Sequence, residues 1–201
     1  MANTRDRILT ATAELFRRHG YRGTSLKQVT VAAAAPFGSL YHFFPGGKQE
    51  LTAAVIDSSG RAYQKLFEVI YDAADDPAAA VRDFFDGAAD VLEQTDYLDP
   101  CPIGSVALEV ASTDDRLRRA TEKVFASWTE AAASRLEALG IARADADDLA
   151  TTLVAAIEGG FMLSRAARSP EPMRATGRLM RTLVETALDN ARTVARAPSR
   201  Q

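Results

Sequence analysis

The chain of 201 residues has a single cysteine, two histidines and one tryptophan, and it lacks any apolar run long enough to cross a membrane. With only Cys101, an intramolecular disulfide framework is excluded, and two histidines far apart in the sequence offer no zinc-ligand spacing. The N-terminus is charged early and lacks the unbroken apolar segment of a secretion signal. These absences predict a cytoplasmic protein that uses no metal or other cofactor and does not enter a membrane.

Patterns typical of catalytic sites are missing as well. The chain has no glycine-rich phosphate loop, no Ser-His-Asp arrangement and no metal cluster, and both His19 and His42 lie near the N-terminus. We therefore expect no enzymatic activity. A small helical enzyme is the alternative from a different functional class, and a screen for hydrolase turnover would test it.

Charge is distributed unevenly along the chain, whose formal net charge is −3. Residues 1–48 hold seven basic and two acidic side chains, a balance of +5, whereas residues 49–201 hold 17 basic and 25 acidic side chains. A basic module joined to a larger acidic body can contact phosphates at one end while the whole protein stays soluble. Basic helices also occur without a nucleic-acid partner, so the asymmetry permits DNA binding without proving it.

Three short helical patterns fill the basic region. Apolar residues at helical spacing predict a first helix from about Thr4 to His19, which Gly20 ends. Thr24 and Ser25 are candidate N-caps of a second helix. Pro36 starts a third, because proline lacks the amide hydrogen that a first-turn residue would leave unpaired. This order predicts a helix-turn-helix, whose second helix lies in a DNA major groove.

The rest of the chain also carries helical patterns, and no segment shows the two-residue alternation of a strand. The expected helices begin at about Lys48, Pro77, Gly104, Asp114, Asp145 and Pro172, and the last five residues, APSRQ, are expected to fray. The predicted fold is therefore all-α. It has an N-terminal three-helix helix-turn-helix domain at residues 1–48, followed at residues 49–201 by a helical bundle.

The third helix supplies most of the candidate DNA contacts. Leu40 and Phe44, spaced i and i+4, are expected to face inward, which leaves Tyr41 and His42 outward as the first choices. Lys48 stands at a helix start, where its charge opposes the helix dipole unless a phosphate is near. Taken alone, Tyr41 and His42 could equally well cover the core. The predicted DNA-binding residues are Thr24, Ser25, Phe37, Gly38, Ser39, Tyr41, His42 and Lys48.

These segments together resemble the TetR family of repressors. The matching residues are GYRGTSLKQV at 20–29, GSLYHFF at 38–44, and then Lys48 and Leu51. The segments APFGSLYHFFPGGK and CPIGSVALEVAS resemble the LmrA/YxaF-like branch in particular. Two residues depart from the family pattern. Ala34 replaces the usual turn glycine, so a positive φ there would be strained, and Phe37, where polar residues are common, could pack on a thymine methyl.

The resemblance implies a homodimeric repressor that binds double-stranded operator DNA and is released by a small-molecule effector. It also implies that the helical bundle at residues 49–201 is the ligand-binding and dimerisation domain. Members of this branch are associated with drug-resistance or flavonoid-responsive operons, so we expect a planar, mainly apolar effector. The last two predicted helices would form a four-helix dimer contact through small residues, although an intramolecular hairpin fits their periodicity equally well. These small residues are Ala155, Ala156, Gly159 and Gly160.

Candidate ligand contacts are mainly aromatic. Trp128 is the first choice, because its indole has a hydrogen-bond donor and a flat face that stacks on planar ligands. The polar candidates are Glu109 and Arg165. The predicted ligand-binding residues are Phe67, Phe84, Phe85, Cys101, Glu109, Phe125, Trp128, Met162 and Arg165. A redox-sensing regulator of the same fold, triggered at Cys101, is the alternative, but the acidic residues before this cysteine offer no positive charge to activate its thiol.

Overall fold

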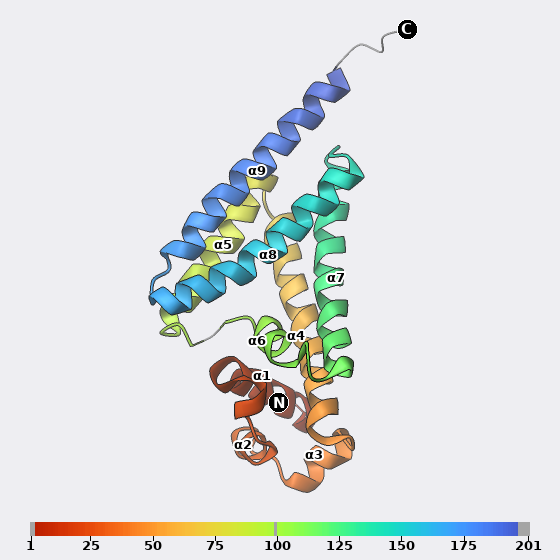
Figure 1. Cartoon of the computed structure of the whole chain (residues 1–201), viewed down its shortest axis with the longest axis vertical. Coiled ribbons are helices and arrows are strands. Elements are labelled where there is room, and N and C mark those ends of the chain that lie inside the picture. Colours follow the sequence, from red (N-terminus) through yellow and green to blue (C-terminus); the bar gives the residue numbers. More distant parts are fainter. Residues whose placement is uncertain (1–2, 99, 197–201) are drawn as a thin grey trace. The chain divides into compact units, whose positions relative to one another are not determined.

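The computed structural model describes residues 3–98 and 100–196, and within these ranges it contains helices and no strand (Figure 1). This confirms the predicted all-α class. The expected frayed tail, residues 197–201, lies outside the described residues. In chain order the helices are α1 (Thr4–Gly23), α2 (Leu26–Ala32), α3 (Phe37–Phe43), α4 (Gly47–Asp72), α5 (Pro77–Gln94), α6 (Pro102–Val110), α7 (Asp115–Ala138), α8 (Arg143–Ala167) and α9 (Glu171–Arg196).

Helix starts and ends follow local signals in the sequence. Gly20 interrupts α1 as expected, since its φ of 73° and ψ of 175° are not helical, and the chain then makes one more turn to Gly23. Pro36 is the N-cap of α3, one residue before the helix begins. The sixth helix starts two residues earlier than predicted, because the Cys101 sulfur caps it by accepting a hydrogen bond from the amide of Gly104 at 3.5 Å.

The chain divides into two compact units, and each contains two separate stretches of sequence. The first unit comprises residues 1–63 and 95–124, and the second comprises residues 64–94 and 125–201. Helices α4 and α7 contribute to both units. This division differs from the predicted boundary after residue 48, because α1 packs against α6 from the middle of the chain. The helix-turn-helix therefore shares its core with residues far along the sequence.

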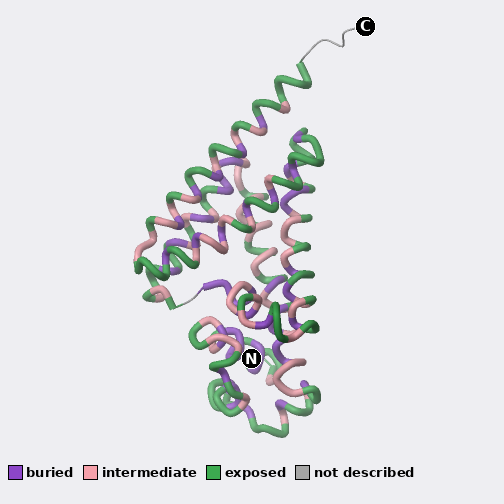
Figure 2. The backbone as a smooth tube through the Cα atoms, in the orientation of Figure 1, coloured by how far each residue is buried: buried purple, intermediate pink, exposed green. Residues whose placement is uncertain are grey.

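Apolar residues of α1 to α4, α6 and α7 form the core of the first unit. Buried residues are coloured purple along the backbone in Figure 2. Thr12 lies within the predicted apolar stripe of α1, and its buried hydroxyl donates to the carbonyl of Ile8 at 2.6 Å. A Cβ at Gly60 would lie 2.7 Å from both methyl carbons of Val124, so glycine permits the close approach of α4 to α7. The fully buried residues include Ile8, Phe16, Val29, Leu40, Leu51, Ile56, Ile103 and Leu117.

The turn between α2 and α3 closes through a left-handed residue. Ala34 has a φ of 47°, as its replacement of the family's turn glycine suggested. The amides of Ala34 and Ala35 donate to carbonyls in the last turn of α2 at 3.1 and 3.0 Å, the paired bonds of a Schellman motif. Arg7 of α1 donates through Nε to the carbonyl of Ala33 at 3.2 Å. These contacts hold Ala34 in a left-handed conformation that is strained for alanine but that glycine adopts without strain.

Replacing Ala34 with glycine is expected to stabilise the protein. We predict that Ala34→Gly raises the free energy of unfolding by about 0.5 to 1 kcal/mol, because relief of the left-handed strain outweighs the added entropy of the unfolded chain. The control is Ala62→Gly, the same change at an exposed interior position of α4, which should destabilise by about the same amount. Urea denaturation measures both. Equal destabilisation by the two substitutions would contradict this explanation.

In the second unit, α5, α8 and α9 pack against one another through close contacts at two glycines. A Cβ at Gly177 of α9 would lie 2.6 Å from the Cβ of Phe85, and one at Gly160 of α8 would lie 2.7 Å from the sulfur of Met173. Gly160, one of the small residues expected at a dimer contact, therefore lies in the packing between α8 and α9 of the same chain. Gly159 differs, since nothing lies within 4 Å of its Cβ position.

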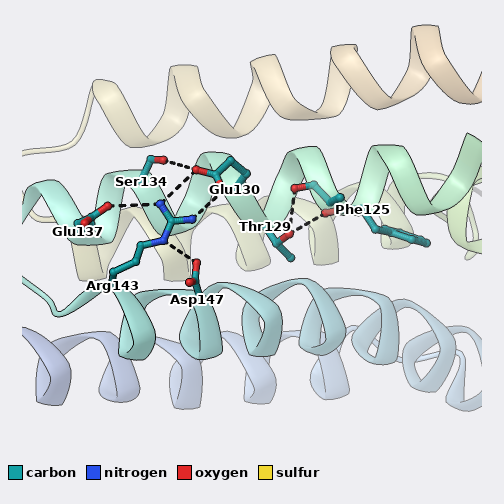
Figure 3. A network of polar contacts seen from close by, with 8 residues as sticks. Phe125, Thr129, Glu130, Ser134, Glu137, Arg143 and Asp147 are labelled. Carbon is teal, nitrogen blue, oxygen red and sulfur yellow. Dashed lines mark hydrogen bonds and ion pairs between the residues drawn. The ribbon is translucent and has the colours of Figure 1, made fainter.

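A polar network joins α7 to α8 across the turn at Gly140, which has a φ of 95° (Figure 3). The guanidinium of Arg143 contacts Glu130 at 2.7 Å, Glu137 at 3.4 Å and Asp147 at 2.9 Å. Hydrogen bonding to Glu130 and Asp147 raises the pKa of Arg143, and its guanidinium lowers the pKa of Glu130. Solvent screens these exposed groups, so they orient the turn more than they stabilise it.

Within the described ranges, no helix combines the length and apolar character needed to span a membrane. The same residues contain no group of three or more metal-ligating side chains.

Candidate nucleic-acid interface

Two predicted DNA contacts at the start of α2, Thr24 and Ser25, have different environments in the structure. Ser25 is the N-cap of α2, and it exchanges hydrogen bonds with Gln28 in a capping box. Thr24 is buried, and its hydroxyl donates to the carbonyl of Gly20 at 2.8 Å. The structure thus turns the hydroxyl of Thr24 inward, away from the DNA contact we expected, because the break at Gly20 leaves a carbonyl within reach. Ser25 stays exposed.

Helix α3 separates its residues into a buried and an exposed side, as its spacing predicts. Leu40 is 0% exposed and Phe44 is also buried, which confirms that this pair faces the core. Tyr41 is 49% exposed and His42 is exposed too. The first residue of the helix, Phe37, is 46% exposed although it is aromatic. The short helix therefore presents two aromatic rings and an imidazole to solvent.

The first half of α3 is open to close approach. Gly38 has no atom within 4 Å of its Cβ position, and Ser39 beside it is partly exposed. Nearby, Lys27 and Val31 of α2 are exposed as well. Neither residue stands out in the sequence, since an isolated charge and an isolated valine carry no periodic signal. An open backbone flanked by polar and apolar side chains suits contacts with both phosphates and base edges.

The Pro-Gly-Gly break sets the direction in which the chain enters α4. Gly47 has a φ of 66°, which favours glycine, and its Cβ position lies 3.8 Å from the ring of Tyr41. The amide of Gly46 donates to the carboxylate of Glu50 at 2.6 Å, so a side chain in the first turn of α4 closes the loop. Lys48 follows directly, and its backbone position is thereby fixed relative to α3.

Lys48 packs on an aromatic ring of α1. Its ammonium lies 4.4 Å from the centroid of the Tyr21 ring, within cation–π distance. Burial lowers the pKa of Lys48, and the negative charge of Glu109 opposes this effect. Burial likewise raises the pKa of Tyr21. The lysine is therefore held beside the turn that leads from α1 into α2.

The predicted ligand-binding residues are divided between the two units. Cys101 and Glu109 belong to the first unit, where the cysteine is buried and the glutamate bonds to backbone amides of α1. A buried thiol with a capping role argues against the redox alternative. The remaining predicted residues belong to the second unit, and they are Phe67, Phe84, Phe85, Phe125, Trp128, Met162 and Arg165.

Within the second unit, the aromatic candidates lie in pairs. Phe67 and Phe84 meet edge to face at 5.5 Å, and Phe125 and Trp128 do so at 5.6 Å, all four being partly buried. Phe85 is buried in the core against Gly177. Two other candidates differ, since Met162 and Arg165 are exposed on α8. Aromatic spacing alone could not distinguish core from surface here.

The outward residues of α3 give the first test of DNA binding. We predict that Tyr41→Ala combined with His42→Ala weakens binding to a DNA duplex, selected by the wild-type protein from a randomised pool, by about a hundredfold or more. Because both side chains are exposed, the free energy of unfolding should change by less than about 1 kcal/mol. Gel-shift titration and urea denaturation measure the two effects.

The matched control for this test is Leu40→Ala in the same helix. Leu40 is fully buried, so its truncation should cost about 2 to 5 kcal/mol of stability. If the double variant kept wild-type affinity for the selected duplex, α3 would not be the recognition helix.

Both the N-terminal and the C-terminal part of the chain match families of known proteins. Residues 8–55 match the model for bacterial regulatory proteins of the tetR family, and residues 77–179 match that for the C-terminal domain of LmrA/YxaF-like transcriptional regulators. The chain is 35% identical to the regulator YxaF of Bacillus subtilis, over 85% of this chain and 90% of that protein. It is 30% identical to the regulator LmrA of the same organism, over 85% and 91%.

Solved structures share the fold. A TetR transcriptional regulator from Legionella pneumophila superposes with a TM-score of 0.80 at 22% identity, covering 90% of this chain and 97% of that one. The regulatory protein TetR from Rhodobacter sphaeroides gives a TM-score of 0.78 at 22% identity, covering 89% and 97%.

Proposed function

Because the chain belongs to the TetR family of transcriptional regulators, with a C-terminal domain of the LmrA/YxaF-like kind, we propose that it is a ligand-responsive repressor acting on operator DNA as a homodimer. As a member of this family the protein is a regulator and not an enzyme. The observation that carries the proposal is α3, which buries Leu40 and Phe44 while exposing Phe37, Tyr41 and His42. The place of action would be the cytoplasm, where bacterial DNA lies.

In the proposed complex, α3 enters the major groove with its first residues toward the base edges. Phe37 would contact a thymine methyl, and the open backbone at Gly38 and Ser39 would approach a phosphate. Tyr41 and His42 would hold the DNA backbone, as would Ser25 at the start of α2. Lys48 would add a phosphate contact, so Lys48→Ala should lower the salt slope of binding by about one unit.

Exposed apolar side chains on α8 and α9, taken together as the proposed dimer face, support dimerisation. Met162 is 60% exposed and Leu163 lies beside it on α8, while Leu179 and Leu183 are exposed one turn apart on α9. Gly159 on α8 adds an open position with room for a neighbouring helix. Large apolar side chains exposed in this way are typical of protein contacts. In the proposed dimer, α8 and α9 of each subunit form a four-helix interface.

Charges introduced on this face are expected to separate the subunits. Met162→Arg and Leu179→Arg should each produce folded monomers, because dimerisation would bury an unpaired charge. Affinity for the selected duplex should fall when the dimer is lost, since one molecule no longer binds both half-sites at once. The control is Leu108→Arg, because this α6 leucine is 82% exposed in the first unit and should leave the dimer intact.

Sedimentation velocity distinguishes monomer from dimer for each variant. A protein that stays dimeric with both arginines present would rule out this face as the interface. Gly160→Arg is unsuitable for the test, since a larger side chain there would collide with Met173 inside the same subunit.

The second unit offers aromatic surface and one polar group for a planar effector. Phe67, Phe84, Phe125 and Trp128 provide partly buried rings. The hydroxyl of Tyr71, next to Phe67 on α4, is buried and has no hydrogen-bond partner, and burial raises its pKa. A ligand with an acceptor group would satisfy this hydroxyl. We therefore propose a mainly apolar, planar effector with at least one acceptor atom.

Effector binding is predicted to change the fluorescence of the chain's single tryptophan. A planar ligand stacked near Trp128 should quench its emission and should release the selected duplex, because the two binding equilibria are linked. Trp128→Ala should lower ligand affinity by about 1 to 3 kcal/mol while DNA binding is retained. Flavonoid-like compounds and planar drugs are the first set to screen.

Tyr71→Phe is the matched variant for the polar contact. This substitution should weaken the binding of ligands that carry an acceptor atom, and it should leave the affinity for purely apolar planar compounds unchanged. Quenching of Trp128 without any loss of DNA affinity would refute the proposed coupling between ligand and operator.

A further inference from the structure

A carboxylate from α6 binds backbone amides of α1. Glu109 accepts hydrogen bonds from the amide of Tyr21 at 2.7 Å and from the amide of Arg22 at 2.8 Å, one on each oxygen. These amides are available because Gly20 leaves helical geometry, so the turn after it begins with N–H groups that lack helical acceptors. Such charge-assisted bonds are roughly twice as strong as neutral ones.

Gly20 is required for this contact in two ways. Its φ of 73° is a conformation that favours glycine, and a Cβ at this position would lie 2.2 Å from an oxygen of Glu109. The glutamate therefore sits directly against the backbone of α1. Residues 88 and 87 positions apart in the chain meet here within a single compact unit.

The amides that Glu109 holds lie beside two of the proposed phosphate contacts. Ser25, the N-cap of α2, lies three residues after the turn at Gly20–Arg22. The Thr24 hydroxyl donates a hydrogen bond to the carbonyl of Gly20 in the same turn. The ring of Tyr21 carries the ammonium of Lys48 at 4.4 Å. The position of one turn therefore affects both the start of α2 and the start of α4.

We propose that Glu109 is a positioning residue for DNA binding, which holds the Gly20–Arg22 turn so that Ser25 and Lys48 meet the DNA backbone together. The inference rests on the proposed DNA-binding function. It assigns Glu109 a role different from the effector contact that its sequence context suggested. Glu109 itself does not touch the DNA and acts through the turn and the Tyr21 ring.

Glu109→Gln is the sharpest variant, because it keeps the size of the side chain. The amide has a single oxygen, and its NH₂ group would face one of the backbone N–H donors. One hydrogen bond and the negative charge beside Lys48 are therefore lost together. The matched control is Glu14→Gln, the same chemical change in an exposed ion pair with Arg18 on α1.

Affinity for the selected duplex is measured at a temperature where circular dichroism shows every variant fully folded. Glu109→Gln should bind about tenfold more weakly than the wild type, and Glu14→Gln should stay within about twofold. Hydrogen exchange at the amides of Tyr21 and Arg22 should accelerate in Glu109→Gln alone. A purely structural role would lower stability and leave the affinity of the folded protein unchanged, which would overturn the proposal.

A second variant tests the path through the aromatic ring. Tyr21→Ala retains the two amides but removes the ring under Lys48, so it should weaken binding about as much as Lys48→Ala. In a protein that already carries Lys48→Ala, Glu109→Gln should then weaken DNA binding less than it does in the wild type, because the two residues act through one contact. Full additivity would contradict this path. A wild-type protein that enriches no duplex would instead overturn the proposed function itself.

Discussion

The packing of α1 against α6 is the constraint on which the helix-turn-helix of this protein depends. Helices α2 and α3 have seven residues each and bury too little apolar surface to be stable alone. Ile103 of α6 and Leu117 of α7, from the middle of the chain, are buried in the same unit. Gly20 makes the contact possible, because it lets the backbone of α1 approach Glu109. The helix-turn-helix thus shares one compact unit with α6 and the first part of α7.

Two residues with left-handed backbone conformation then flank α3, one at each end. Ala34 closes the turn before α3, and Gly47 closes the turn after it. Between them, Leu40 anchors the helix in the core, so the outward direction of Tyr41 and His42 follows from geometry. Because the alanine is strained where glycine would be relaxed, this helix-turn-helix retains less stability than its sequence could reach. The outer side of α3, with the exposed rings of Phe37 and Tyr41, suits shape and methyl contacts alongside phosphate binding.

Periodicity in the sequence predicted the helices and the two sides of α3, because burial repeats with the helical turn. It could not predict contacts between distant segments. Glu109 bonds to amides 87 and 88 residues away, and no local pattern signals such a pairing. Thr24 turned inward because its acceptor exists only where Gly20 breaks α1. Gly159 and Gly160 look equivalent in a small-residue stripe, yet one is open and the other meets Met173.

The most direct test of the account is the pattern of sequence that the wild-type protein selects from a pool of randomised DNA duplexes. A dimer presenting two α3 helices should enrich two inverted half-sites whose centres lie about 10 to 10.5 base pairs apart, or a multiple of that spacing. Enrichment of a single unrepeated site, or of no sequence at all, would contradict a homodimeric operator-binding repressor.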